Sequence, residues 1–324
     1  MMTMPLPTGD VIGILGDNLR LRGSVLPLPS RVATKWTQGL DLPRGGETVL
    51  YTGMMYQLIP YIEGLVKAEQ RLGDSRLARW TGLGRAVNRR INLSAFMTRP
   101  SAAERAAFDR VPINVVHLLR AAGVEFGSLY EDDLYSGALA YDLGLDEVFG
   151  DHARRVQATL RAHGVRQVIT IDPHTTNMLR SVYPKIVDGF DVEVRTYLEV
   201  LAEKGFGANG RGRLVGDVAV HDSCVFARYE GLVDQPRELL AAAGLTLREP
   251  EHTGRQTWCC GGPVESLYPA KAAANAARRV GELGAAASEV VTMCPMCYVN
   301  LSGAADGAVR FTDISEYLRN AYAS

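Results

Sequence analysis

The chain contains 324 residues, of which 47% are hydrophobic and 22% are charged, and its formal net charge is −1. This composition is typical of a folded globular protein with room for two domains of ordinary size. The near-zero net charge argues against nucleic acid or an acidic membrane surface as the main partner.

The first 46 residues contain no positively charged segment that leads into an apolar one, so they do not resemble a signal peptide. No apolar run approaches the ~18 residues that a membrane span needs. We therefore expect a cytoplasmic protein without a membrane span, in which residues 1–46 form a leader that packs on the first domain. Disulfides are rare in the cytoplasm, where grouped cysteines more often bind metals or carry out redox chemistry.

After the leader, short β-branched segments alternate with amphipathic helical segments. We expect strands near residues 46–53, 166–172, 212–222 and 289–294, and helices near residues 59–73, 151–164, 235–244 and 269–284. Several of these helices end at a glycine, which is a common helix stop. The alternation predicts an α/β fold in which mostly parallel sheets carry helices on their faces.

Residues 73–109 form an Arg-rich insertion that the second half of the chain lacks. The pattern favours one or two amphipathic helices with an exposed basic face. This face is either a solvated surface or a docking surface for a partner subunit, and the sequence leaves both interpretations open. The segment around residues 180–213 is expected to link the two domains.

Three segments of the first half recur in the second half, in the same order and at similar spacing. "TVLYTGM" parallels "VAVHDSC", "LYSGALAYDLG" parallels "WCCGGPVESLY", and "RQVITIDPHTTNML" parallels "SEVVTMCPMCYVNL". The motif "ARRV" also recurs, in each case inside a helical pattern ahead of a strand. Self-similarity of this kind predicts two tandem related domains, a pseudo-twofold repeat that covers residues 47–195 and 196–324.

All five cysteines of the chain lie in the second repeat. Cys224, Cys259, Cys260, Cys294 and Cys297 align with Met54, Tyr135, Ser136, Asp172 and Thr175 of the first repeat. Two of these thiols each follow a predicted strand, and the carboxyl ends of parallel strands line the crevice where ligands bind. The spacing therefore lets all five sulfurs meet at one edge of the second domain.

The simplest alternative for any one cysteine is a small buried hydrophobe, but all five fall at strand-end or glycine-loop positions of one repeat. A disulfide framework disagrees with the compartment and the odd count, and a thioredoxin-like CxxC leaves three thiols unexplained. A metal site remains. Structural zinc takes four ligands, usually as two short pairs, whereas thiolates also hold iron–sulfur clusters.

The two adjacent cysteines, Cys259 and Cys260, can face the same group only if the backbone turns at that point, because neighbouring side chains on a strand point to opposite faces. Gly261 and Gly262 allow such a turn and a close approach of the backbone to inorganic sulfide. His221 and Asp222 precede Cys224, where they either hydrogen-bond the sulfurs of the site or have a plain structural role.

A cysteine, an interval, Cys-Cys-Gly, a similar interval and CxxC together resemble the cysteine-rich CCG domain. This domain occurs in heterodisulfide reductases and in iron–sulfur subunits of glycolate oxidase, anaerobic glycerol-3-phosphate dehydrogenase and lactate-utilisation systems. Residues 214–302 carry the full pattern, including "HDSC" ahead of the first interval. Members of the family usually have two such domains in tandem, as the repeat predicts here.

The resemblance implies one non-cubane [4Fe-4S] cluster per chain, and in some relatives a CCG domain holds zinc instead. The implied ligands and metal-site residues are Cys224, Cys259, Cys260, Cys294 and Cys297, with Gly261 beside the cofactor and with Cys224 and Cys260 as the residues that carry the catalysis. The first domain lacks these thiols and is expected to hold no cluster, which departs from the two-cluster pattern.

We therefore expect an oxidoreductase subunit of a heterodisulfide reductase-like complex, which transfers electrons to or from a disulfide or thiol substrate, small or protein-bound. The expected partners are a ferredoxin-like iron–sulfur subunit and a flavoprotein subunit, because the chain shows no ferredoxin-like stretch of repeated CxxC. Two alternatives stay open: a non-catalytic electron relay in a flavin-dependent dehydrogenase complex, and a structural zinc module.

Overall fold

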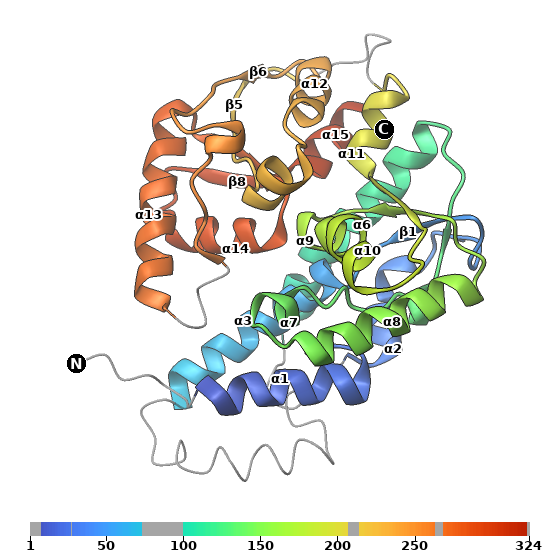
Figure 1. Cartoon of the computed structure of the whole chain (residues 1–324). Helices are drawn as coiled ribbons and strands as arrows, with labels where there is room; N and C mark the ends of the chain where they lie inside the picture. The colour runs from blue at the N-terminus through green and yellow to red at the C-terminus, as the bar shows by residue number, and fades with distance from the viewer. Residues whose placement is uncertain (1–7, 27, 73–99, 207–213, 263–267, 323–324) are drawn as a thin grey trace.

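The computed structural model describes residues 8–26, 28–72, 100–206, 214–262 and 268–322, which fold into two α/β units (Figure 1). The sheet of the first unit consists of β1 (Thr48–Tyr51), β2 (Gly127–Ser128), β3 (Gln167–Thr170) and β4 (Glu193–Thr196). The sheet of the second unit consists of β5 (Asp217–Val220), β6 (Thr246–Leu247), β7 (Glu289–Thr292) and β8 (Arg310–Asp313).

The two sheets have the same strand order, β2-β1-β3-β4 in the first unit and β6-β5-β7-β8 in the second. Every strand pair in both sheets is parallel. The prediction of two related α/β units with parallel sheets is therefore confirmed. The four central strands also match the segments predicted from β-branched runs, whereas the short outer strands had no apolar run to identify them.

The registers of the two sheets match as well. Val168 of β3 pairs with Val49 of β1, and its counterpart in the repeat, Val290 of β7, pairs with Ala219 of β5. These pairs lie at equivalent positions of the two aligned segments, so the backbone frame places Met54 where the second unit has Cys224. The sequence repeat is thus a repeat in space.

Helices cover the sheets of both units. In the first unit they are α1 (Thr8–Arg22), α2 (Ser30–Ala33), α3 (Met55–Leu72), α6 (Ala102–Ala121), α7 (Ala138–Asp142), α8 (Asp146–Ala162), α9 (Pro173–Asn177), α10 (Tyr183–Ile186) and α11 (Tyr197–Glu203). In the second they are α12 (Asp234–Ala242), α13 (Pro269–Ala286), α14 (Pro295–Ala304) and α15 (Ile314–Tyr322).

Local sequence explains where the helices that matter most begin. A capping box of Ser101 and Glu104 starts α6, and another of Thr196 and Glu199 starts α11. α9 and α14 begin with proline directly after Asp172 and Cys294, and proline at the first helical position supplies the fixed φ that a helix needs. Each of these two helices therefore starts at a residue that the repeat aligns with a ligand position.

The last helix of each unit packs against the other unit. α11, which follows the first sheet, contacts α12, and α15, which follows the second sheet, contacts α6. Leu119, Leu198, Leu240 and Leu318 of these four helices are fully buried in one hydrophobic cluster. Tyr56 adds a hydrogen bond of 2.7 Å from its hydroxyl to the Asp313 carboxylate across the same boundary. The two units therefore share a continuous core.

The segment ahead of the first sheet contains α1, which packs on α8 of the first unit. Residues 73–99 of the Arg-rich insertion lie outside the described residues, and its last residues belong to the start of α6. The segment expected to link the units also contributes structure, since β4 and α11 lie within residues 180–213. β4 is only four residues long and reads "EVRT", so no apolar run marks it.

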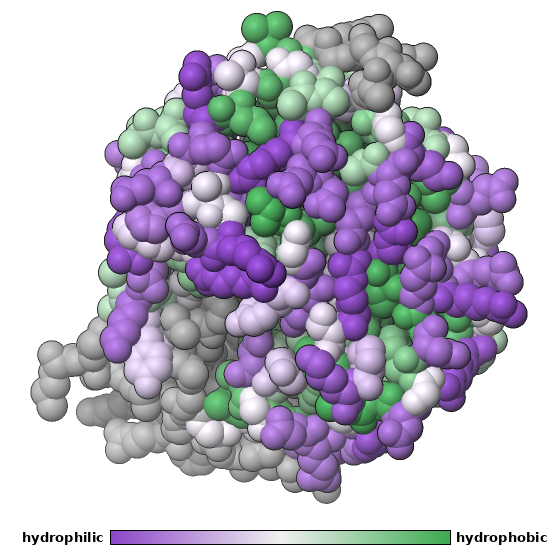
Figure 2. Space-filling view, turned by 45° about the horizontal axis from the view of Figure 1, so that its top comes forward, coloured by the Kyte–Doolittle hydropathy of each residue, from purple (hydrophilic) through white to green (hydrophobic). Residues whose placement is uncertain are grey.

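Hydrophilic residues cover most of the described surface on the face drawn in Figure 2, and hydrophobic side chains appear there in small patches. Among the described residues, none of the helices combines the length and the apolar character that crossing a bilayer demands.

Candidate metal centre

Three loops of the second unit meet at the carboxyl end of its sheet. The first carries Cys224 four residues after β5, and the second carries Cys294 at the N-cap of α14, two residues after β7. The third runs from the 3₁₀ turn η6 (Gly254–Gln256) to Cys259 and Cys260. Parallel strands bring their carboxyl ends to one edge, so this fold gathers residues that lie seventy positions apart in the sequence.

All five sulfur atoms form one chain of contacts. The Cys259 sulfur accepts hydrogen bonds from the thiols of Cys224 and Cys260, and the Cys297 thiol donates to both Cys260 and Cys294. The structure therefore brings together every thiol that the sequence predicted for the site. It does so without help from any disulfide, since all five cysteines are free.

Two of the sulfurs receive backbone hydrogen bonds. The Gly261 N–H donates to the Cys259 sulfur at 3.3 Å, and the Cys297 N–H donates to the Cys294 sulfur. For Cys259, the donors Cys224 and Cys260 lower the pKa of the thiol, and the Gly261 N–H adds to this effect. The pKa of the Cys294 thiol is also lowered: its burial opposes ionisation, but hydrogen bonds from Cys297 and His174 outweigh it. Thiolates, the form that binds metals, are thus favoured at two of the five positions.

The glycines after the cysteine pair are required by the geometry. Gly261 has φ +88°, and a Cβ there would lie 2.6 Å from the backbone oxygen of Ala272. A Cβ on Gly262 would lie 3.5 Å from the Cys260 sulfur. The left-handed turn at Gly261 lets both Cys259 and Cys260 join the same sulfur group, as the sequence predicted.

Solvent reaches only one side of the group. Cys260, Cys294 and Cys297 are buried, whereas Cys224 and Cys259 are half-buried. The exposed edge of the site is therefore formed by Cys224 and Cys259. Trp258 lies next to this edge, with its indole stacked on the His252 ring at a centroid distance of 4.0 Å.

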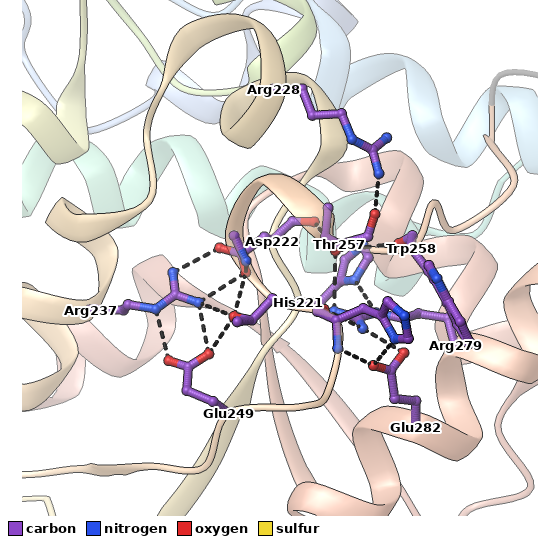
Figure 3. Close-up of polar contacts among 12 residues, drawn as sticks. His221, Asp222, Arg228, Arg237, Glu249, Thr257, Trp258, Arg279 and Glu282 are labelled. Atoms are coloured by element: carbon purple, nitrogen blue, oxygen red, sulfur yellow. Dashed lines mark hydrogen bonds and ion pairs between the residues drawn. The ribbon is translucent and has the colours of Figure 1, made fainter.

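His221 and Asp222, which the sequence left between two roles, have different surroundings (Figure 3). The Asp222 carboxylate binds the Arg237 guanidinium at 2.8 and 2.9 Å and accepts the Gly254 N–H at 2.7 Å. Although burial opposes its ionisation, the bonds from Arg237 lower the pKa of Asp222. Asp222 thus has a structural role, because it fixes the loop that leads to the cysteine pair.

His221 is directed toward the sulfur group instead. A nitrogen of His221 and the sulfurs of Cys260 and Cys297 all lie within 4.8 Å of one another. Its Nδ1 accepts a hydrogen bond of 3.2 Å from Arg279, and its Nε2 is buried without a protein partner. Burial, with a contribution from Arg279, lowers the pKa of His221 to about 3, so the ring is neutral.

The first unit contributes one residue to this site. His174, at the start of α9, hydrogen-bonds the Cys294 sulfur of the second unit. Burial alone would lower the pKa of His174, but this bond and the nearby charges of Cys294 and Asp172 raise it to about 9. The site is therefore completed from both halves of the chain.

The equivalent positions of the first unit contain no thiol. Met54, Tyr135, Ser136, Asp172 and Thr175 are all buried. The Asp172 carboxylate accepts the Thr175 N–H at 2.9 Å, which matches the contact between the Cys297 N–H and the Cys294 sulfur in the second unit. Gly137 keeps the left-handed turn of Gly261, with φ +81°. The two units thus share the frame, while the donor atoms differ.

The donor set of the second unit suits an iron–sulfur cluster. It consists of sulfur alone apart from His221, its interior is closed to water, and backbone N–H groups point at its sulfurs. Soft thiolate ligands and N–H donors to sulfur are the protein features that such clusters use. Oxygen donors, which Mg²⁺ and Ca²⁺ prefer, are absent from this group of described residues.

Sequence reasoning did not assign a role to Arg279, Thr257 or His174. The only signal for Arg279 was its place in the repeated "ARRV" motif, which marked a helix but not a function. His174 belongs to the other unit, and its contact with Cys294 depends on how the two units pack. No local pattern could have revealed that contact.

Comparison with known proteins supports this assignment of the second unit. Residues 218–302 match the family model described as the CCG cysteine-rich domain. The resemblance predicted from the cysteine spacing is therefore confirmed, and it covers the stretch that carries all five thiols.

The relatives of the chain are iron–sulfur oxidoreductases. It is 31% identical over 223 residues to the probable iron-sulfur-binding oxidoreductase FadF of Bacillus subtilis, which covers 65% of this chain and 31% of that protein. It is 31% identical over 216 residues to a probable membrane-anchored ferredoxin of Chromohalobacter salexigens, 62% of this chain and 32% of that protein. It is 26% identical over 199 residues to one polypeptide of the dihydromethanophenazine:CoB–CoM heterodisulfide reductase of Methanosarcina mazei, 58% of this chain and 49% of that protein.

The matched region thus spans about a third of the first two relatives and about half of the third. The chain is related to the iron–sulfur subunits of oxidoreductases through a part of their length.

Proposed function

We propose that the chain is an iron–sulfur subunit of a redox complex, and that its second unit holds one non-cubane [4Fe-4S] cluster on Cys224, Cys259, Cys260, Cys294 and Cys297. The observation that carries this proposal is the chain of contacts that joins all five sulfurs at the end of one parallel sheet. A structural zinc ion needs four ligands and leaves the fifth thiol without a role.

When bound, the cluster supplies one-electron chemistry at a potential set by its surroundings. The chain shields one side of the site, since Cys260, Cys294 and Cys297 are buried. It leaves the other side accessible at Cys224 and Cys259. A disulfide or thiol substrate, or a protein that delivers electrons, therefore meets the site at Cys224, while Cys260 acts from the interior.

The partners follow from the same arrangement. The described residues hold a single group of thiols, so the electrons must reach it from another carrier. We propose a ferredoxin-like iron–sulfur protein or domain and a flavoprotein as these carriers, in a complex that acts on a small or protein-bound disulfide. The relatives include a probable ferredoxin and a polypeptide of a heterodisulfide reductase, which supports both kinds of chemistry.

A second candidate is an electron relay without substrate chemistry of its own. It is favoured by the similarity to a ferredoxin, and by the burial of Cys260, which restricts direct contact of a substrate with that sulfur. The two candidates share the cluster and differ only in what reaches the edge at Cys224.

Metal and sulfide analysis after anaerobic purification tests the cluster. We expect about four iron atoms and several acid-labile sulfides per chain; about one zinc per chain without iron would support the zinc module instead. Titration of the reduced protein with small disulfides then separates catalysis from relay. A paramagnetic species that appears only with the disulfide supports catalysis, whereas an unchanged spectrum supports the relay.

A further inference from the structure

Arg279 is a fully buried arginine beside the sulfur group, and its guanidinium has acceptors on several sides. Its Nη1 donates to the His252 carbonyl and to the Glu282 carboxylate, both at 2.8 Å, and its Nη2 donates to the Thr257 hydroxyl at 3.2 Å. Its Nε donates to His221 Nδ1 at 3.2 Å (Figure 3). These contacts hold Arg279 in one orientation on the inner side of the site.

The contact from Arg279 fixes the tautomer of His221. An arginine stays protonated in proteins, so its Nε–H can only donate. The Nδ1 of His221 must therefore offer a lone pair, and the single proton of the neutral ring lies on Nε2. This Nε2 is buried, has no protein partner, and belongs to the residue that lies within 4.8 Å of the Cys260 and Cys297 sulfurs.

This arrangement argues against His221 as a metal ligand. A ring that accepts from Arg279 at Nδ1 could bind a metal through Nε2 only as an imidazolate, after the loss of its one proton. The Nε2–H is suited to a different role, a hydrogen bond to sulfur. Hydrogen bonds to the sulfurs are one of the ways in which a protein sets the potential of an iron–sulfur cluster.

The first unit provides an internal comparison. Arg155 has the place of Arg279 in the repeated "ARRV" motif, yet it is exposed, with its guanidinium near Gly23. Tyr51 has the place of His221, and its hydroxyl donates to the Leu134 carbonyl at 2.7 Å. The buried pair of arginine and histidine thus occurs in the unit that has the thiols, and its counterparts in the other unit lie apart.

We propose that Arg279 acts as a positioning residue that orients His221, and that the His221 Nε2–H donates to a sulfur at Cys260, Cys297 or the bound cluster. This inference rests on the cluster assigned under the proposed function. Because Glu282 lies 2.8 Å from the guanidinium and balances its charge, the effect on the site comes from the directed N–H. The hydrogen bond stabilises the more negative, reduced state and raises the reduction potential.

The test compares four variants of the full chain, His221→Leu, His221→Gln, Arg279→Gln and Arg155→Gln, each purified anaerobically. The readouts are iron per chain and the midpoint potential from a redox titration followed by electron paramagnetic resonance. We expect His221→Leu to retain iron and to reduce at least tenfold less favourably, a shift of about 59 mV for one electron. His221→Gln keeps an N–H donor and should recover most of this shift, Arg279→Gln should lower the potential less than His221→Leu, and Arg155→Gln should match the unmodified protein.

An unchanged potential in His221→Leu at full iron content would overturn the inference and leave the cluster standing. Absence of iron from the unmodified protein would instead overturn the proposed function. A second measurement does not depend on the variants folding: ¹⁵N spectra of histidine-labelled, metal-free protein should show a buried neutral ring with its proton on Nε2. A buried ring near Arg279 with its proton on Nδ1 would contradict the proposed orientation.

Discussion

The two units have the same parallel sheet, the same register and the same left-handed glycine ahead of the third strand of the sheet, yet among the described residues only one has the chemistry of a metal site. In the second unit, the loops at the strand ends carry sulfur, and a buried cation with a neutral histidine lies behind them. In the first unit, the same positions carry methionine, tyrosine and oxygen donors. The comparison shows that the frame is a scaffold that tolerates both kinds of lining, and that the side chains decide the function.

The cysteine-free unit still has a part in the site. His174 hydrogen-bonds the Cys294 sulfur, and α11 and α15 exchange contacts between the units. A unit that has no thiols thus stabilises the one that has them. This explains why both units are needed even if only one of them holds a cofactor.

The largest expected effect comes from exchanging equivalent residues at the start of α14 and α9. Cys294→Ala removes a central sulfur, so we expect iron to fall from about four atoms per chain to nearly none. Asp172→Ala, at the equivalent position, should leave the iron content unchanged. Iron analysis of the two variants, prepared side by side without oxygen, measures the difference. Equal iron in both would mean that the equivalence of the two sites does not determine where the cluster binds.

The next effect concerns the buried ion pair behind the cysteine loop. Arg237→Met leaves the Asp222 carboxylate, whose side chain is 1% exposed, without its partner. Removing one member of such a pair is expected to lower the free energy of unfolding by about 3–5 kcal/mol. The exposed pair of Arg248 and Asp217 offers a matched control, since Arg248→Met should change it by less than about 1 kcal/mol.

Denaturant unfolding of the two variants without metal gives both values. A similar, small loss in the two proteins would show that Asp222 is stabilised by its backbone donors and that Arg237 contributes little to the loop.

A smaller effect distinguishes the two glycine turns. Gly261→Ala puts a Cβ at positive φ and against the backbone of Ala272, which cannot move away without shifting α13. We expect a loss of about 3 kcal/mol and weaker retention of iron. In Gly137→Ala the Cβ would meet the Phe149 ring at 2.9 Å, which can rotate, so a loss of about 1–2 kcal/mol is expected. Thermal unfolding ranks the pair, and a larger loss in Gly137→Ala would reverse the ranking.

Much of this comparison could be predicted from the sequence. β-branched runs marked the four central strands, and the order of three repeated segments predicted two related units. The cysteine spacing predicted that five thiols meet, and the glycines explained how Cys259 and Cys260 can face one group. These features are local, or they follow from the rule that parallel strands end at one edge.

What the sequence could not predict depends on packing between distant segments. β2 and β6 have two residues each, so their pairing partner defines them more than their composition does. The buried orientation of Arg279 could not be distinguished from the exposed orientation of Arg155, because the motif around them is identical. Which way an arginine points is set by its neighbours in space, here His221 and Glu282.

The smallest effect depends on pH and concerns the boundary between the units. Burial raises the pKa of Asp313 to about 6, while its equivalent in the first unit, Thr196, does not titrate. A carboxyl whose pKa is higher in the folded state stabilises the fold below its unfolded pKa, and this contribution is lost as the pH rises through about 6. Asp313→Asn keeps the shape without the titration.

The unfolding free energy of the unmodified protein, taken relative to that of Asp313→Asn, should therefore decrease between about pH 4 and pH 7 by at most about 3 kcal/mol. Denaturant titrations at several pH values measure it. A difference that is constant across this range would mean that the Tyr56 hydrogen bond keeps the carboxylate ionised at a normal pKa.

The most direct test of the central claim is anomalous diffraction at the iron absorption edge from crystals grown without oxygen. We predict one region of strong anomalous density at the carboxyl end of the second sheet, surrounded by the five cysteine sulfurs, and none beside Met54 and Asp172 of the first sheet. A peak only at the zinc edge, or iron bound away from these sulfurs, would contradict the account.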